Sequence, residues 1–328
     1  MEQPDVSVVV VTWNAREHAE RCLESVRGRD LIVVDNGSTD GTVELVRERF
    51  PEVRIVEQEN RGMGGGNNAG MRLAEGRWFF LLNSDAWVVG DGLDALVAYG
   101  DAHPEAAVVG PRLRNPDGSL QRSVRGEPNL WRLSTEYLGI RKLAPHTNLL
   151  NQDGTLQRSV RGEPNLWRLS TEYLGIRKLA PHSNLLNPLY VGGFDHDTET
   201  EADWLYAAAL LVRREAVEQV GMFDEDFFMF SEEVDWLTRF RRAGWKVLFT
   251  PSAEVVHVGG ASHGGQLYVE NLRGLLRFEA KHHGPDAAEH TRLLLLASLR
   301  LRYAVLRRES YRDGIRFLSS GDAASLLR

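Results

Sequence analysis

The stretch WFFLLNSD at residues 78–85 is an apolar run that ends abruptly in an amide and a carboxylate. Its apolar part is too short for a helix and follows Gly76, so it predicts a strand buried on both faces, as in a parallel sheet. Ligands of open α/β sheets bind outside the carboxyl ends of the strands, so Asn83 and Asp85 would face a cleft. Oxygen ligands completed by a substrate's phosphates suit Mg²⁺ or Mn²⁺. The alternative is that Asn-Ser-Asp only turns the chain and caps a helix near Asp91.

Short β-branched and apolar runs alternate with amphipathic segments around this stretch. The further strands are expected at residues 6–12, 31–34, 53–56, 106–109, 204–212 and 245–249. The helices are expected at residues 17–27, 42–50, 93–102 and 232–242, with a short one ending at 220. This alternation predicts an α/β fold with a doubly wound, mostly parallel sheet flanked by helices and joined by right-handed crossovers.

The bulk composition excludes several classes of protein. The chain has 328 residues, 42% of them hydrophobic and 26% charged, as is usual for a globular protein. Its formal net charge of −7 argues against a general nucleic-acid binder. The single cysteine, Cys22, lies in a helical pattern, which favours a buried, inert thiol in a reducing, cytoplasmic setting. No signal-peptide pattern precedes the first strand, and no apolar run approaches the ~20 residues that span a bilayer, so at most peripheral membrane contact is expected.

Polar side chains also follow the first two predicted strands. Thr12 and Asn14 come at the end of the first strand, and Asp35 ends the second. The third strand leads to the glycine-rich stretch NRGMGGGNNAG at 60–70, which opens a helix through Leu73. Glycines let a backbone approach a ligand and a helix N-terminus favours anions, although a flexible turn would have the same composition. The stretch is not a dinucleotide fingerprint, because it follows the third strand, and it lacks the Lys-Ser/Thr of a P-loop.

A 36-residue segment is repeated in tandem. Residues 115–150 recur as 151–186, with only three differences: Pro116/Gln152, Ser119/Thr155 and Thr147/Ser183. Identity at polar as well as apolar positions indicates a copied segment, and two units are too few for a solenoid. We hypothesise that one copy fills the native place in the fold and that the other is a tolerated insertion.

A second stretch with candidate chemistry, FDEDFFMFSEEVDW, occupies residues 223–236. Carboxylates cluster among aromatic residues here, an environment that can raise a pKa and create a general base. Glu232 and Glu233 would lie in the first turn of a helix, so the alternative is that they only favour its positive end. Further along, His257 follows an apolar run, where a packed histidine and a metal ligand are both possible.

The chain is predicted to be helical from Tyr268 onward. Residues 293–306 carry a leucine-rich face interleaved with arginines. Such basic and apolar groups could bind the inner membrane surface. A helix that packs on its own domain with solvated arginines would show the same pattern.

Five short motifs occur in an order that resembles a known family. They are VTWN at 11–14, VDNGSTDG at 34–41, NRG at 60–62 with Asn67 and Gly70, LNSD at 82–85, and FFMFSEEVD at 227–235. Together they resemble family-2 glycosyltransferases of the GT-A fold, and in particular the rhamnosyltransferase-like branch of cell-wall and polysaccharide assembly. The resemblance covers roughly residues 6–284, except one copy of the repeat, and it implies a GT-A-type sheet. The helical C-terminal extension is expected from the sequence pattern after Tyr268.

The resemblance implies an inverting transfer of a sugar from a nucleotide-diphosphate donor to an acceptor hydroxyl. Thr12 and Asn14 would flank the nucleotide, and Asp35 would hold its base or ribose. The glycine-rich stretch would border the diphosphate. The donor-binding residues implied in this way are Thr12, Asn14, Asp35, Asn60, Gly62, Asn67 and Asn83.

The same resemblance implies roles in catalysis. Asp85 would bind the Mg²⁺ or Mn²⁺ that neutralises the leaving diphosphate. Asn83 stands where many members have Asp, which leaves Asp85 as the one carboxylate ligand, and His257 matches a histidine that helps bind metal in some relatives. Inversion needs one base to deprotonate the acceptor. Glu233 aligns with the family's usual second acid and is the expected base, with Glu232 as the alternative.

We expect the chain to divide into four segments. Residues 1–114 would bind the nucleotide sugar, 115–186 form the tandem duplication, 187–266 form the acceptor and catalytic half, and 267–328 form the helical extension. The preferred donor is dTDP-rhamnose and the acceptor a saccharide or polyprenyl-linked saccharide. A cytoplasmic protein with peripheral contact to the inner membrane face through the basic C-terminal helix, and a homo-oligomer, are further expectations. Two alternatives are a UDP-hexose donor and a non-catalytic sugar-nucleotide-binding or scaffold protein disabled by the duplication.

Overall fold

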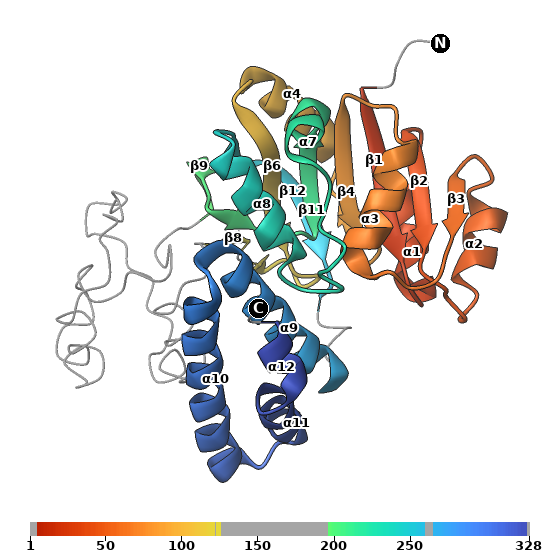
Figure 1. The fold of residues 1–328 in the computed structure, drawn as a ribbon. Helices are drawn as coiled ribbons and strands as arrows, with labels where there is room; N and C mark the ends of the chain where they lie inside the picture. The colour runs from red at the N-terminus through yellow and green to blue at the C-terminus, as the bar shows by residue number, and fades with distance from the viewer. Residues whose placement is uncertain (1–4, 122, 126–195, 260–264, 327–328) are drawn as a thin grey trace.

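The computed structural model describes residues 5–121, 123–125, 196–259 and 265–326 (Figure 1). The second copy of the repeat and most of the first lie outside these residues. A ten-stranded sheet forms the centre, with strands in the order β3-β2-β1-β4-β11-β6-β12-β5, while β7 pairs with β6 and β9 with β12. A separate two-stranded sheet pairs β8 with β10.

The strands of the large sheet are β1 (Val6–Thr12), β2 (Asp30–Asp35), β3 (Arg54–Glu57), β4 (Trp78–Asn83), β5 (Ala86–Val88), β6 (Ala106–Arg114), β7 (Leu120–Gln121), β9 (Thr200–Glu201), β11 (Ala209–Arg213) and β12 (Lys246–His257). The small sheet consists of β8 (Val124–Arg125) and β10 (Trp204–Leu205). The helices are α1 (Arg16–Glu24), α2 (Thr42–Arg49), α3 (Gly62–Leu73), α4 (Gly92–Ala102), α7 (Arg214–Val220), α8 (Glu232–Arg242), α9 (Gly265–His283), α10 (Pro285–Leu306), α11 (Glu309–Leu318) and α12 (Gly321–Ser325).

Strand direction brings the polar strand ends to one edge of the sheet. β1 runs parallel to β2 and β4, and β2 runs parallel to β3. β11 is antiparallel to both β4 and β6, so β6 and its parallel partner β12 point the same way as β4. The sheet is therefore mostly parallel. Thr12, Asp35, Asn83 and His257 all end strands at the same, carboxyl edge.

Helices cover both faces of the sheet (Figure 1). One face packs against α1, α2 and α4, with Leu96 in its core, and the other packs against α3, α7 and α8, with Trp236 in its core. Val8 belongs to the first core and Val9 to the second, and both are fully buried. A strand covered on both faces has no reason to alternate polar and apolar residues, which explains the continuous apolar run of β1.

The C-terminal helices form a core of their own. Leu272, Leu295, Leu299 and Phe317 pack together from α9, α10 and α11. Figure 1 shows these helices beyond the carboxyl edge of the sheet. The predicted α/β fold and helical extension are confirmed. Among the described helices, none combines the length and apolar character needed to cross a bilayer.

Three local expectations change. The run expected as one strand at 204–212 is divided between two sheets by a turn at residues 207–208. Tyr206 N–H donates to the carbonyl of Ser123 at 3.0 Å beside the pairing of β10 with β8, whereas the carbonyl of Ala208 accepts from Asn83 N–H at 2.9 Å beside the pairing of β11 with β4. The strand expected at 245–249 continues to His257. Residues 84–85 do form a turn, which leads into β5, but the expected capping is wrong, because α4 begins at Gly92 without a side-chain cap.

Cys22 is buried within α1, as expected. Burial, and then the negative charge of Asp85, raise the pKa of the Cys22 thiol. The thiol therefore stays protonated at neutral pH, which fits an inert core residue.

Candidate active site

Asp35 ends β2 and is 2% exposed. One carboxylate oxygen accepts a hydrogen bond from the Thr12 hydroxyl at 2.9 Å. The other accepts from the backbone N–H groups of Gly37 at 3.0 Å and Ser38 at 2.8 Å. Thr12 is fully buried, so its hydroxyl holds the Asp35 carboxylate from the interior side of the sheet edge.

Asn14 links the loop after β1 to the loop after β2. Its φ of 50° lies in the left-handed region, which asparagine tolerates better than most residues. Its backbone N–H donates to Ser38 Oγ at 2.8 Å, and its side-chain Oδ1 accepts from Thr39 N–H at 2.8 Å. Because Asn14 is exposed, the two loops present a polar surface at the carboxyl edge.

The N-terminus of α3 is packed between β2 and the loop 223–231. Asn36 Nδ2 donates to the carbonyl of Gly62 at 3.0 Å. Gly62 has a φ of 73°, and a Cβ there would lie 1.8 Å from the carbonyl oxygen of Phe228. The same carbonyl accepts from Met63 N–H at 3.1 Å. At Gly62, the missing side chain therefore lets the backbone of Phe228 approach closely, where a ligand was expected.

Asn60 and Asn67, both expected near the diphosphate, bond within their own segment. Asn60 Oδ1 accepts from the first N–H group of α3 at 3.0 Å, and Asn67 Nδ2 donates to the carbonyl of Met63 at 3.0 Å. Asn68, which no sequence motif singled out, donates to the carbonyl of Phe223 and accepts from its N–H, both at 3.0 Å. This pair of bonds fixes the loop 223–231 on α3.

Asn83, Asp85 and His257 meet at the carboxyl edge. His257 Nε2 lies 3.3 Å from Asp85 Oδ1 and 3.5 Å from Asn83 Nδ2. Asp85 Oδ2 also accepts from the backbone N–H of Gly259 at 3.2 Å. Burial acts to raise the pKa of Asp85, but the hydrogen bond and charge of His257 outweigh it and lower that pKa. The structure thus brings together the two side chains expected to bind a metal.

The donor atoms of this cluster suit a divalent ion. A carboxylate from Asp85 and an imidazole from His257 fit Mn²⁺ better than Mg²⁺, which prefers oxygen ligands. Within the described ranges, no group of three His, Cys, Asp or Glu side chains is placed to hold an ion. A metal held by these two residues would take its remaining ligands from phosphate or water.

Glu232 and Glu233 are the first two residues of α8 and are 7% and 9% exposed. The Oε2 atom of each is buried without a hydrogen-bond partner among the described residues. Burial raises the pKa of Glu233 to about 7. Burial and then the charge of Glu233 raise the pKa of Glu232 well above its usual value. The positive end of a helix would lower both values, so burial dominates and the pair suits proton transfer better than simple helix capping.

The backbone just before the pair is strained. Phe230 and Ser231 both have a φ of 68°, which non-glycine residues rarely adopt. Such strain persists where the surroundings enforce it and is common at functional sites. The strained residues directly precede Glu232 and Glu233, which are buried at the start of α8.

Asp235, within the first turn of α8, has the opposite environment. Its Oδ1 lies 2.7 Å from His282 Nε2 and 2.8 Å from Lys281 Nζ, and its Oδ2 accepts from Arg239 Nε at 2.9 Å. Although burial acts to raise it, these contacts lower the pKa of Asp235 to about 2. A fully paired, ionised carboxylate is a poor base, so Asp235 fastens α8 to α9 instead.

The loop 223–231 joins the two halves of the site. Its Glu225 forms an ion pair with Arg61 at 2.9 Å, next to the start of α3. On the other side, Gly274 of α9 packs so closely that a Cβ would lie 2.4 Å from the carbonyl oxygen of Phe230. The loop contacts the start of α3, which follows the carboxyl end of β3. The start of α8, with Glu232 and Glu233, therefore lies at the same edge of the sheet as the polar strand ends.

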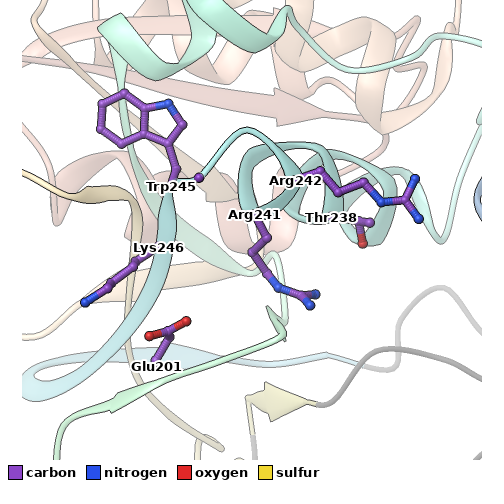
Figure 2. Close-up of a pocket in the computed structure, with 7 residues that line it drawn as sticks. Glu201, Thr238, Arg241, Arg242, Trp245 and Lys246 are labelled. Carbon is purple, nitrogen blue, oxygen red and sulfur yellow. The ribbon is translucent and has the colours of Figure 1, made fainter.

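A pocket of about 400 Å³ lies away from these residues (Figure 2). It is lined by Glu201, Thr238, Arg241, Arg242, Gly244, Trp245 and Lys246. These residues belong mainly to the end of α8 and the start of β12, so the pocket lies at the opposite edge of the sheet. The expected site residues do not line it.

Sequence comparison assigns the chain to a family. Residues 7–159 match the family model for Glycosyl transferase family 2. The chain is 31% identical over 325 residues, 93% of its length and 94% of the relative's, to the N-acetylglucosaminyl-diphospho-decaprenol L-rhamnosyltransferase of Mycobacterium tuberculosis strain CDC 1551. The sequence from strain H37Rv matches equally well. The chain therefore belongs to glycosyltransferase family 2. The expected family, its rhamnosyltransferase-like branch and a glycosyltransferase activity are confirmed.

Solved structures agree on the fold. A crystal structure of GalNAc-T7 with UDP, GalNAc and Mn²⁺ aligns with a TM-score of 0.54 and 14% identity over 85% of the chain, which spans 48% of that longer protein. The mannosyltransferase PcManGT from Pyrobaculum calidifontis, in complex with GDP-Man and Mn²⁺, aligns with a TM-score of 0.52 and 18% identity over 99% of the chain and 87% of its own. The GT-A-type fold is confirmed.

Proposed function

We propose that this chain transfers rhamnose from dTDP-rhamnose to a polyprenyl-linked saccharide, with inversion, in cell-wall or polysaccharide synthesis. The observation that carries the proposal is the 31% identity over 93% of the chain to a relative named for L-rhamnosyl transfer to N-acetylglucosaminyl-diphospho-decaprenol. Near-complete coverage of both chains means that the likeness includes the acceptor half and the C-terminal helices as well as the donor half.

Glu233 is the proposed base. Inversion requires a group that takes the proton of the acceptor hydroxyl as that oxygen attacks the anomeric carbon opposite the leaving diphosphate. Glu233 has a carboxylate oxygen without a partner among the described residues and a pKa raised to about 7, which suits a base working near neutral pH. Glu232 would share the buried position and raise the proton affinity of the pair.

Asp85 and His257 are the proposed metal ligands, and Mn²⁺ is the preferred ion. The ion would stabilise the negative charge that develops on the leaving diphosphate. Asn83 lies 3.5 Å from His257 and is proposed to orient the donor beside the ligands. Asp35, with Thr12 beneath it and Asn14 holding the adjoining loop, is proposed to bind the nucleoside.

The proposed division of labour follows the chain. Residues 1–114 would bind the nucleotide sugar, and residues 187–266 would supply the base and the acceptor surface. The contact of α9 with the loop 223–231 supports a role for the 267–328 extension in shaping that surface. A cytoplasmic location is proposed because the donor is a soluble nucleotide sugar.

A donor panel tests the proposed reaction. Purified chain is incubated with a short-chain polyprenyl-diphosphate N-acetylglucosamine acceptor, Mn²⁺ or EDTA, and either dTDP-rhamnose or a UDP-hexose, and the product is measured by mass spectrometry. Transfer is expected only with dTDP-rhamnose and Mn²⁺. Transfer from a UDP-hexose would show that the donor is a UDP-hexose and not dTDP-rhamnose. Neither transfer nor donor hydrolysis with any sugar would favour the scaffold alternative.

A thermal-shift control accompanies the panel. A ligand that binds only the folded chain adds about 2.7 kcal/mol of stability at 100 times its dissociation constant. The true donor should therefore raise the melting temperature in the presence of Mn²⁺. A rise without turnover would separate binding from catalysis.

We further propose that α10 contacts the membrane that carries the acceptor. Leu293 and Leu301 are 48% and 61% exposed, and Arg300 and Arg308 are also exposed. Exposed leucines with neighbouring arginines suit the interface of an anionic bilayer. Figure 1 shows α10 on the same side of the sheet as its carboxyl edge.

Vesicle sedimentation tests this contact. Arg300→Glu with Arg308→Glu should weaken binding to vesicles containing anionic phospholipid, and high salt should weaken the wild type as well. Arg47→Glu with Arg49→Glu in α2 makes the same charge change at exposed positions at the far end of the sheet and should have no effect. Equal binding of all variants would refute the contact.

A further inference from the structure

Gln121 of β7 connects the repeated segment to His257. Its Oε1 lies 2.8 Å from His257 Nδ1, and its Nε2 lies 3.0 Å from Asn115 Oδ1. Gly259 packs against the same imidazole and amide, since a Cβ there would lie 3.3 Å from His257 Cε1 and 3.5 Å from Gln121 Nε2. The imidazole is therefore confined by two neighbouring segments.

A series of hydrogen bonds fixes the direction in which the Gln121 amide points. It begins at the carboxylate of Asp117, which can only accept, and to which the Ser119 hydroxyl donates at 2.6 Å. The Ser119 oxygen in turn accepts from Asn115 Nδ2 at 2.8 Å. Asn115 then has only its oxygen to offer to Gln121. As a result, Gln121 presents its NH₂ group to Asn115 and its oxygen to the histidine.

This direction determines the role of Nδ1 of His257 and leaves Nε2 to face Asp85. Nδ1 must carry a proton, because it faces an amide oxygen. In the neutral ring Nε2 then offers a lone pair, and it lies 3.3 Å from the Asp85 carboxylate. Two electron-rich atoms face each other at this distance only with a cation or a proton between them. Metal-binding histidines generally donate their second N–H to an acceptor that fixes the ring in this way.

We infer that Gln121 is a positioning residue that holds His257 ready to bind the metal, and that the first copy of the repeat supplies it. The inference rests on the proposed metal-dependent transferase. The second copy carries the same residue types at the matching positions, with Thr155 replacing Ser119 and Gln157 replacing Gln121. The chain therefore offers two candidates for one position.

Chain connectivity selects the first copy. β7 follows β6 after a tight turn, in which Asn115 N–H donates to the carbonyl of Ser119 at 2.8 Å and Gly118 has a φ of 81°. The matching residues of the second copy would need a connection of about 40 residues in place of about five. Loop-closure entropy disfavours the longer connection by about twentyfold. Leu120 and Gln121 already pair with Arg114 and Leu113 of β6, so that place in the sheet is filled.

The repeat itself provides the matched control. Mn²⁺ binding to the full chain is titrated by electron paramagnetic resonance in the presence of saturating dTDP. Gln121→Ala should weaken Mn²⁺ binding by about 10- to 100-fold, the usual effect of removing a partner of a ligating histidine. Gln157→Ala should bind as the wild type does. Gln121→Glu, which keeps an oxygen acceptor for Nδ1–H, should restore most of the affinity, and thermal unfolding should show that every variant is folded.

Two results would overturn the inference. They are wild-type affinity in Gln121→Ala and weakened affinity in Gln157→Ala. A wild-type chain without Mn²⁺ affinity would overturn the proposed metal site together with this inference. Normal Mn²⁺ affinity without rhamnosyl transfer would refute the proposed donor or reaction and leave the role of Gln121 standing.

Discussion

Replacing Glu233 with glutamine should stabilise the protein and abolish its activity. The pKa of Glu233 is raised from 4.5 to about 7 because the carboxyl group is buried. The folded chain therefore binds this proton more tightly than the unfolded chain. The contribution of this bound proton to the free energy of unfolding is fully present below pH 4.5 and is lost as the pH rises through about 7. Glutamine has nearly the same shape without the charge, so it avoids this loss.

The size of the effect follows from the two pKa values. Each pKa unit is worth about 1.4 kcal/mol, so a rise from 4.5 to about 7 corresponds to about 3 kcal/mol at pH 8. At pH 5 the same calculation gives less than about 1 kcal/mol. For a domain of this size, 3 kcal/mol raises the melting temperature by roughly 6–12 °C.

The assay compares melting temperatures of wild type and Glu233→Gln at pH 5 and pH 8, together with rhamnosyl transfer at pH 8. Loss of a general base should lower the transfer rate by about 10²- to 10⁴-fold while the donor still binds. Glu17→Gln is the matched control, because Glu17 lies in the first turn of α1 but is exposed. It should change neither quantity.

Three results would refute the reasoning. A stability difference between Glu233→Gln and wild type that is the same at both pH values would show that burial of the charge is not its source. Full transfer activity in the variant would move the role of base to Glu232. Lower stability of the variant at pH 8 would also contradict the expected sign.

The wild-type transfer rate should rise roughly tenfold between pH 6 and pH 8 as Glu233 ionises, and a flat pH profile would exclude it as base. Asp235→Asn should lower the free energy of unfolding at pH 7 by about 2 kcal/mol, measured by urea denaturation, since its pKa is lowered from 3.8 to about 2. That difference should shrink as the pH falls through this range, and equal stability at pH 7 would contradict the role given to its ion pairs. Gly62→Ala should destabilise more than Gly90→Ala in the same measurement. Both positions have positive φ, but only at Gly62 does a Cβ meet a backbone atom, the Phe228 carbonyl at 1.8 Å. Equal losses would mean that the loop shifts freely.

The strands that could be predicted are those whose own residues determine them. β1 was predicted with both ends correct, because its β-branched run is buried on two faces and followed by polar residues. β4 is equally self-contained. The run 204–212 is just as apolar, yet it is divided because its first part pairs with β8 and its last part with β4, two strands distant in the sequence. Contacts of that kind leave no local pattern.

In the candidate site, too, some residues could be recognised from the sequence and others only from their contacts in the fold. Asp85 and His257 could be singled out because their residue types and family motifs carry chemistry, and the structure brings them within 3.3 Å. Gln121 could not, since a glutamine in a repeated turn looks like an ordinary surface residue. Asn68 was missed because its partner, the backbone of Phe223, lies 155 positions away. The signal for both lies in packing rather than in the residue itself.

The outer strands of the sheet affect how this protein can associate. β3 and β5 end the main strand path and contain four and three residues. β3 also begins and ends with charged residues, Arg54 and Glu57, and Arg54 is bound by Asp30 of the neighbouring strand. Short edge strands offer few free backbone groups to another chain, and the charged ends of β3 disfavour pairing further. In the part of the chain that the structure describes, self-association by strand pairing at the edges of β3 and β5 is therefore disfavoured.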